Sequence, residues 1–405
     1  MRLAHQRPDS PHTRGGWLEE HLSTTGTVVD RGLEGVVVGA TELSNVEGQI
    51  GRLTYRGFDI DDLAPNVSFE EVVHLLLCGH LPNASELESL KRELTARRAL
   101  PEPLIAAMQS VPKTAWPMDV MRTIVSGLSL FVPVNDHGEH VSDVHSAIEL
   151  VAKMTTILAA WDRIRRGLEP IDPRADLSHA ANFLYMRTGK VPSEIEEDAI
   201  DTYLVLLADH SYNASTFSAR VTASTRADIY AGVTAALATL TGDLHGGAAS
   251  ASYNNLVAIG SPEKAEQFVR DELGRGNRIM GMGHREYRVR DPRAKHLDAV
   301  AKRLSEHVGN SKWYRIAREL EVQSQRILAE EKPDRQIYAN VDFYTAPLLA
   351  DLGIPGDEFT CLFACGRVAG WTAHILEQLH DNRLIRPQAT YVGPPPGPFV
   401  PIDKR

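Results

Sequence analysis

The sequence is poor in cysteine, with three among 405 residues, and it has no long apolar run. So few cysteines cannot form a disulfide scaffold, and they favour a soluble protein of the reducing cytoplasm. Cys361 and Cys365 are four apart in an apolar stretch, and we expect core thiols, since a zinc site would need further ligands at regular spacing. The densest apolar stretch, residues 72–78, is far shorter than the roughly 20 residues of a bilayer span. A disulfide-stabilised or membrane-spanning protein is therefore excluded.

Basic residues are also in deficit. Lysine and arginine number 43 against 53 aspartates and glutamates, which gives a net charge of −10. An acidic chain repels polyanions, so nucleic acid and membrane surfaces are poor candidates for its main partner. Apolar residues make up 43% and charged residues 24%, which are the ordinary proportions of a globular protein.

The first 34 residues differ from the rest, because they are polar and lack the apolar centre of a signal peptide. Three arginines (Arg2, Arg7 and Arg14) with a single early acid, Asp9, leave an organelle-transit segment open as an interpretation. A flexible N-terminal tail is the interpretation that this composition favours.

Most of the remaining chain has the pattern of helices. Capping-box sequences at Ser68, Ser85 and Ser193 precede apolar residues at helical spacing, and Pro262 follows Ser261 at an expected first helical position. Strand signals are few. Residues 36–38 and 53–56 are short β-prone stretches bounded by glycines, and they predict a small hairpin near the start. The fold class is therefore mainly α with a small N-terminal β-hairpin.

Four segments have compositions that helix formation does not explain. They are residues 208–216 around His210, 242–248 around His245, 281–293 around His284, and 340–344 around Asp342. Each has a structural explanation when taken alone: a buried histidine often only fills a hydrogen-bonding role, glycines make turns, and Asp342 could cap a helix. Gly281 and Gly283 also lack the preceding strand and third glycine of a dinucleotide-binding loop.

Positive charge is concentrated in the third segment and its flanks. Residues 275–295 hold seven basic and two acidic residues, a local charge of +5 in an acidic protein. Such a run can be a solvated surface. Because glycines and a histidine interrupt it, a loop that binds an anion is also indicated, since backbone N–H groups and arginines bind phosphate and carboxylate. The expected ligand is a small polyanion.

In this order, the four segments resemble the citrate synthase family, in particular its bacterial and archaeal branch, which also includes 2-methylcitrate synthases. The resemblance runs over residues 35–394 and includes residues 51–60, 366–371 and 386–387. It implies an almost all-helical homodimer. Its large domain would comprise residues 35–246 and 349–405, and a small domain of residues 247–348 would close over the active-site cleft.

The resemblance also implies the roles of three catalytic residues. His245 corresponds to the histidine that hydrogen-bonds the thioester oxygen, Asp342 to the base that removes the α-proton, and His284 to the histidine that polarises the oxaloacetate ketone. The chemistry is consistent with these roles, because an enolate oxygen needs a prepositioned donor. If His245 lies at a helix start, the dipole there would keep it neutral. Burial beside Phe343 and Tyr344 should raise the pKa of Asp342.

Substrate contacts follow from the same resemblance. It assigns His210, Arg293 and Arg367 to oxaloacetate, Arg386 to the oxaloacetate of the neighbouring subunit, and Arg288, Gly281 and Gly283 to CoA. Two carboxylates on oxaloacetate make a clamp of arginines and histidines chemically reasonable. No metal and no cofactor is implied, because the CoA thioester is itself a substrate.

Three positions depart from the family pattern: Ser211, where an acid is common, and Thr345 and Gly366, where serine is common. These bear on acyl-chain preference rather than reaction type, and no residue decides between acetyl-CoA and propionyl-CoA.

Two other functions remain open. His210, His245, His284 and Asp342 could bind a divalent metal in a hydrolase, although they lack tight ligand spacing. The chain could also be a CoA-binding protein without activity.

Overall fold

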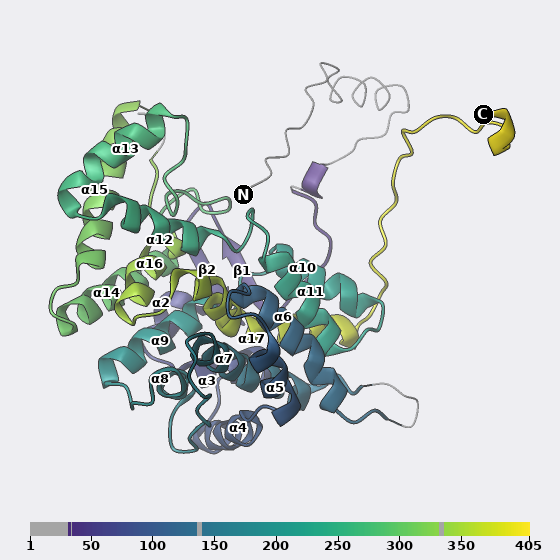
Figure 1. Cartoon of the computed structure of the whole chain (residues 1–405), viewed down its shortest axis with the longest axis horizontal. Coiled ribbons are helices and arrows are strands. Elements are labelled where there is room, and N and C mark those ends of the chain that lie inside the picture. The colour runs from purple at the N-terminus through teal and green to yellow at the C-terminus, as the bar shows by residue number, and fades with distance from the viewer. Residues whose placement is uncertain (1–30, 34, 136–139, 332–335) are drawn as a thin grey trace. The chain divides into compact units, whose positions relative to one another are not determined.

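The structure is a computed structural model that describes residues 31–33, 35–135, 140–331 and 336–405. Its contacts divide the chain into two units, Met1–Ala40 with Ile385–Arg405, and Thr41–Leu384. In the first unit the described residues are mostly irregular, with short 3-10 turns η1 (Arg31–Leu33) and η5 (Ile402–Lys404). The predicted N-terminal tail, residues 1–34, lies outside the described residues apart from η1. Figure 1 shows that the second unit is built almost entirely of helices.

A three-stranded antiparallel sheet opens the second unit, in the order β1 (Ser44–Glu47), β2 (Arg52–Tyr55) and β3 (Phe58–Asp59). The hairpin prediction is confirmed, and its second strand lies where expected. The prediction of a first strand at residues 36–38 is wrong. Those valines are exposed and belong to no strand. β2 pairs instead with the more polar β1, because a tight turn through Gly51 (φ 68°) brings β1 against it.

Local capping signals set most of the predicted helix starts. α3 (Phe69–Cys78) begins with the Ser68 capping box, and α9 (Glu194–Leu207) begins with the Ser193 one, so both predictions are confirmed. The prediction for Ser85 is wrong: Asn83 caps α4 (Ala84–Arg97), and Glu86 is its capping-box partner. Asparagine caps as well as serine does, so two registers compete in this sequence. Pro262 begins η3 (Pro262–Lys264), which leads into α13 (Ala265–Gly274).

The remaining described helices are α2 (Ile60–Leu63), α5 (Glu102–Ser110), α6 (Pro117–Leu128), η2 (Ser129–Phe131), α7 (Val144–Arg165), α8 (His179–Thr188), α10 (Ala214–Ser224), α11 (Ile229–Leu240), α12 (Ala248–Ile259), α14 (Pro292–His307), α15 (Lys312–Glu331), α16 (Val341–Asp351), η4 (Gly356–Glu358) and α17 (Phe359–His380). Within the described residues, no helix combines the length and apolarity that a bilayer span requires.

The core is centred on α17, which is buried along most of its length and packs against α7, α9, α10 and α11. A helix that is apolar on all sides belongs in an interior. Cys361 and Cys365 are free, fully buried thiols in this helix, as predicted. Gly370 lets α17 approach the end of α9 closely, because its N–H donates to the Ala208 carbonyl at 2.9 Å and a Cβ would clash there.

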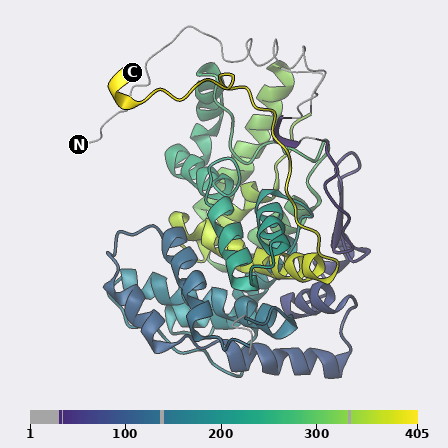
Figure 2. The same cartoon turned by 90° about the vertical axis from the view of Figure 1, so that its right-hand side faces the viewer.

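A second group of helices surrounds α16. It contacts α12, α14 and α15, and α13 packs on α15. Figures 1 and 2 show this group extending from one end of the α17 core, with α4 near the opposite end. All four segments singled out in the sequence begin or end at helix termini here, and this brings residues that are far apart in sequence to one region.

Candidate active site

The first site segment follows the end of α9. The Tyr55 hydroxyl of β2 lies 3.2 Å from the carbonyl oxygens of Val205, Leu206 and Asp209, and so covers the helix end. The Asp209 carboxylate is fully buried and accepts hydrogen bonds from Ser44 and, at 3.3 Å, from His374 Nε2. These contacts from β1, β2 and α17 fix the backbone that presents the next residue, His210.

His210 lies in an aromatic cluster with His284 and Tyr287. Its Nε2 is 3.2 Å from the Tyr287 hydroxyl, and its ring centroid is 5.7 Å from that of His284. Burial lowers the pKa of His210 well below its ordinary value, and the nearby charge of Arg293 lowers it further. Burial likewise lowers the pKa of His284 to about 4. Both imidazoles are therefore neutral at pH 7.

The hydrogen bonds of His284 define its tautomer. Its Nδ1 accepts from the backbone N–H groups of Glu286 at 3.0 Å and Tyr287 at 3.3 Å. A backbone N–H can only donate, so Nδ1 has no proton and Nε2 bears one. His284 is thus a neutral imidazole with a single donor, and that donor can polarise a carbonyl oxygen.

Arg293 is held by a bidentate ion pair with Asp291. Its Nε and Nη2 lie 3.0 and 2.9 Å from the two carboxylate oxygens, and both side chains are buried. The same carboxylate caps α14 through the Arg293 N–H and accepts the Val341 N–H at 3.1 Å. Asp291 therefore joins the starts of α14 and α16, and it places an arginine close to Asp342.

The two glycines of the third segment pair with the strand-like residues before α16. Asn340 N–H donates to the Gly281 carbonyl at 2.9 Å, and its Nδ2 donates to the Gly283 carbonyl at 2.7 Å. Both glycines have φ above 80°, a left-handed conformation that disfavours other residues. A Cβ on Gly281 would lie 2.9 Å from Phe343 Cα, so the third and fourth segments meet at a distance that only glycine permits.

Asp342 lies in the first turn of α16, and Asn340, rather than Asp342, caps this helix. Burial raises the pKa of Asp342 to about 6, although the charges of Arg293 and Arg367 oppose the rise. The expected direction of the pKa shift is thus present. In the part of the chain that the structure describes, no group donates a hydrogen bond to the Asp342 carboxylate, so its oxygens are available to accept a proton.

His245 lies in the turn between α11 and α12. Its Nε2 is 3.3 Å from the Ser215 N–H and 2.8 Å from the Ser215 hydroxyl, whose oxygen also accepts from the Trp371 indole at 3.1 Å. Because the N–H donates to Nε2, the proton of the neutral ring is on Nδ1. Burial lowers the pKa of His245 to about 4, and the charge of Arg367 lowers it further, so the ring is neutral at pH 7.

The charged side chain of Arg367, in α17, acts on several of these titratable groups. It is buried, and its Nε donates to the Leu207 carbonyl at 2.6 Å. Burial lowers its pKa to about 10, so it stays charged at pH 7. This charge lowers the pKa of His210, His245 and Asp342 alike. Its terminal nitrogens have no hydrogen-bond partner among the described residues, which suits an anion-binding group.

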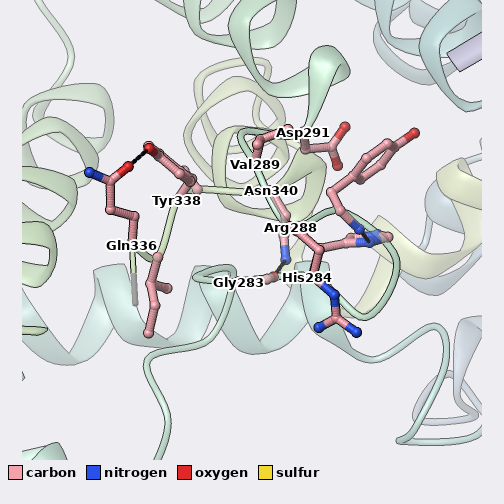
Figure 3. A pocket seen from close by; sticks show the side chains of 11 residues that line it. Gly283, His284, Arg288, Val289, Asp291, Gln336, Tyr338 and Asn340 are labelled. Carbon is pink, nitrogen blue, oxygen red and sulfur yellow. Dashed lines mark hydrogen bonds between the residues drawn. The ribbon is translucent and has the colours of Figure 1, made fainter. Parts of the chain in front are cut away.

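A cavity of about 250 Å³ opens beside this cluster. Its lining comes from two segments, residues 336–340 and six residues between Gly283 and Asp291, and Figure 3 shows His284, Arg288 and Asp291 among them. Arg288 is exposed, and its N–H donates to the Gly48 carbonyl at 2.9 Å. Arg386 belongs to the other unit, so its role stays a prediction.

Several residues of the site were missed in the sequence. Tyr287, Asn340 and Ser215 are hydrogen-bond partners whose importance depends on tertiary contacts. Asp291 could have been found, because Asp-Pro-Arg is a helix-start pattern that places a carboxylate beside the Arg293 backbone.

The metal-site alternative is wrong for these residues. Within the described chain, His210, His245, His284 and Asp342 do not form a group whose ligand atoms are close enough to share one ion. The arrangement can instead supply two neutral imidazole donors, one carboxylate base and a pair of buried arginines.

Comparison with known proteins is consistent with this geometry. The family model "Citrate synthase, C-terminal domain" matches residues 32–388. This chain belongs to the citrate synthase family. Citrate synthase 2 of Bacillus subtilis is 46% identical over 93% of this chain and 99% of its own length. A 2-methylcitrate synthase of Shewanella oneidensis is 38% identical over 95% of this chain and 100% of its own length.

A solved structure extends the match to three dimensions. Citrate synthase of Thermoplasma acidophilum, in a ternary complex with carboxymethyl coenzyme A and oxaloacetate, has a TM-score of 0.85 and is 33% identical. The match covers 93% of this chain and 100% of that one. The mainly α fold expected for a citrate synthase family member is therefore confirmed.

Proposed function

We propose that this protein condenses acetyl-CoA with oxaloacetate and hydrolyses the citryl-CoA intermediate to citrate and CoA. Family membership over nearly the whole chain supports this reaction. The observation that carries it is the Asp342 carboxylate, which has a pKa raised to about 6 and no hydrogen-bond donor among the described residues. The buried arginines whose charges act on it, Arg367 and Arg293, also act on the two neutral histidines, His245 and His284. Enolisation needs such a base together with such donors.

Proton removal is the first step. An Asp342 oxygen takes a proton from the methyl carbon of acetyl-CoA, the electron pair of that C–H bond forms the C=C bond of an enolate, and the carbonyl electron pair moves onto the thioester oxygen. The Nδ1–H of His245 donates to the thioester oxygen as negative charge develops there. Because Nε2 of His245 is engaged by Ser215, only this donor is available to the substrate. A neutral imidazole suits this step, because its acidity is closer to that of the enol than the acidity of a charged imidazolium is.

Carbon–carbon bond formation follows. The enolate carbon attacks the ketone carbon of oxaloacetate as the thioester C=O bond re-forms, and the Nε2–H of His284 hydrogen-bonds the ketone oxygen while it takes the electron pair of the broken π bond and becomes the alkoxide of citryl-CoA. Arg293, Arg367 and His210 bind the carboxylates of oxaloacetate, and Arg386 reaches them from the neighbouring subunit of a homodimer. Asp291 leaves only part of the Arg293 guanidinium free, so it fixes the direction from which this arginine binds.

The CoA part of the substrate lies toward the exposed side of the cavity. Arg288 is the residue there that pairs with a CoA phosphate. Gly281 and Gly283 shape the loop along which the CoA lies. Residues 247–348 form a small domain that closes over residues 35–246 and 349–405 and excludes water before the enol forms. The reaction needs no cofactor, and the scarcity of cysteine supports a cytoplasmic location.

2-Methylcitrate synthesis from propionyl-CoA is the second candidate, because a 2-methylcitrate synthase is also among the relatives. One methylene is worth only about 1–3 kcal/mol of discrimination, so small changes in the pocket decide between the two acyl groups.

The test is free-thiol release by purified protein with oxaloacetate and either acetyl-CoA or propionyl-CoA. We expect release with acetyl-CoA at the higher kcat/KM. A higher value for propionyl-CoA would establish the second candidate instead. No release with either substrate, from folded protein that still binds oxaloacetate, would establish a CoA-binding protein without activity.

A further inference from the structure

Two histidines and a glutamate meet where α3 ends and α4 begins. His74 lies in the last turns of α3, His80 follows the helix-ending Gly79, and Glu86 lies in the first turn of α4. One ligand atom from each lies within 4.8 Å of the others, and within the described chain no other group of histidine, cysteine and acid side chains is this compact. None of the three lines the active-site cavity. The citrate synthase reaction therefore leaves this cluster unexplained.

The spacing of two of these atoms matches a tetrahedral metal site. His80 Nε2 and Glu86 Oε1 are 3.3 Å apart in a direct hydrogen-bonding contact, which a bound ion would replace. Two ligands held about 2.0–2.1 Å from one zinc ion at the tetrahedral angle are separated by about 3.3 Å. An ion placed between these two atoms would need no change in their separation, and a ring nitrogen of His74 lies within 4.8 Å of both.

The outer contacts of the cluster hold the ligands as a metal site requires. His74 Nδ1 lies 2.9 Å from the His80 carbonyl, which can only accept, so Nδ1 bears the proton and Nε2 has a free electron pair. Glu86 Oε2 accepts the Asn83 N–H at 2.8 Å within the capping box, which leaves Oε1 for the ion. Metal ligands in proteins are usually oriented in this way, by a hydrogen bond from the side-chain atom that does not bind the metal.

Exposure and charge fit a site that solvent can reach. His74 is 8% exposed, whereas the His80 and Glu86 side chains are 57% and 38% exposed. The two exposed ligands give an ion a path from solvent, while the buried one is fixed in α3. Two imidazoles and one carboxylate are a typical zinc ligand set with the fourth position left for water.

We propose that His74, His80 and Glu86 bind a divalent transition-metal ion, with Zn²⁺ the best match, and that the ion ties the end of α3 to the start of α4. The site is independent of the proposed reaction, because its residues are none of the proposed catalytic residues (His245, His284 and Asp342) and do not line the active-site cavity. Its occupancy stabilises the fold by binding only the folded state.

The experiment uses full-length, tag-free protein stripped with a chelator and dialysed against ZnSO₄, with metal per chain measured by mass spectrometry. We expect one ion per chain in the wild type and its loss in His80→Ala and Glu86→Gln. Glutamine keeps the capping box, so Glu86→Gln removes the charge without removing the helix start. Thiol-release activity should be unchanged in both variants.

His145→Ala is the matched control, because His145 Nδ1 lies 2.9 Å from Glu93 of the same α4 without a second histidine in the group. Cys78→Ser controls for binding by the exposed thiol near the site. Both controls should keep the ion, and Zn²⁺ should raise Tm by roughly 2–4 °C in them but not in the two site variants. Zinc uptake that is absent in the wild type, or unchanged in His80→Ala and Glu86→Gln, would overturn the proposal.

Discussion

At the residue scale, the candidate site combines uncharged histidines with a weakly acidic aspartate. Burial is the largest cause of the pKa shifts of His245, His284 and Asp342, and it acts in opposite directions on the two residue types because it disfavours whichever form is charged. The same surroundings thus produce hydrogen-bond donors without charge and a carboxylate that is a stronger base than usual. Two predictions follow from Asp342.

Asp342→Asn removes the proposed base without changing its size. We expect turnover to fall at least about 100-fold, in line with the contribution of general-base catalysis, while oxaloacetate still binds. Steady-state thiol release and calorimetric oxaloacetate titration measure the two effects. Near-normal turnover in this variant would refute the assignment of the base.

The same variant should be more stable than wild type at pH 7.5. The folded-state pKa of Asp342, about 6, exceeds the ordinary aspartate value, so the folded protein binds this proton more tightly than the unfolded chain does. Stability therefore decreases as pH rises from about 4 to 6 and stays lower above that range. Asparagine removes this cost, worth roughly 1–3 kcal/mol. Urea unfolding at pH 7.5 and pH 4.5 should give a stability gain that shrinks at the lower pH.

At the element scale, the site is assembled from helix termini rather than from helix faces. The starts of α14 and α16 are joined through the Asp291 carboxylate, and the backbone around Gly281 and Gly283 pairs with the residues that precede α16. The groups that we propose to act are therefore positioned by hydrogen bonds that involve the backbone, and we expect the glycines to be where this arrangement is most sensitive to substitution.

Gly281→Ala and Gly283→Ala test that sensitivity as a matched pair. Both residues have φ near 80°, but an added Cβ meets Phe343 Cα at 2.9 Å at position 281 and only the Ile337 side chain at 3.6 Å at position 283. Both variants should lose about 1 kcal/mol from the backbone conformation. Gly281→Ala should lose more, and its kcat should fall further because Phe343 adjoins Asp342. Equal losses of Tm and kcat in the two variants would contradict the close approach.

At the scale of the whole molecule, the second unit surrounds the α17 core, and α17 itself supplies Arg367 to the site. The remaining proposed oxaloacetate ligand, Arg386, belongs to the other unit. The proposed homodimer gives it a role, since each site would then be completed by the neighbouring subunit. Full activity would then require the dimer.

Mixing inactive variants tests the shared site. Arg386→Ala should weaken oxaloacetate binding, and His245→Ala should abolish enolisation, so each homodimer should be nearly inactive. A mixed dimer has one site in which both wild-type residues meet, and part of the activity should return after subunit exchange. Exchange is verified by native mass spectrometry, and no return of activity in verified mixed dimers would count against delivery of Arg386 from the neighbour.

The sequence by itself determined the mainly α fold and the starts of α3 and α9, because capping and helical periodicity are local properties. It also singled out the four candidate site segments, through their composition and their resemblance to the citrate synthase family. Competing local signals explain its errors: Asn83 displaced Ser85 as a cap, and residues 44–47 displaced residues 36–38 as a strand. Only the tertiary structure decided which nitrogen of His245 and His284 bears the proton, and that Asp291 joins α14 to α16. These features depend on burial and on partners distant in the chain, which no local pattern specifies.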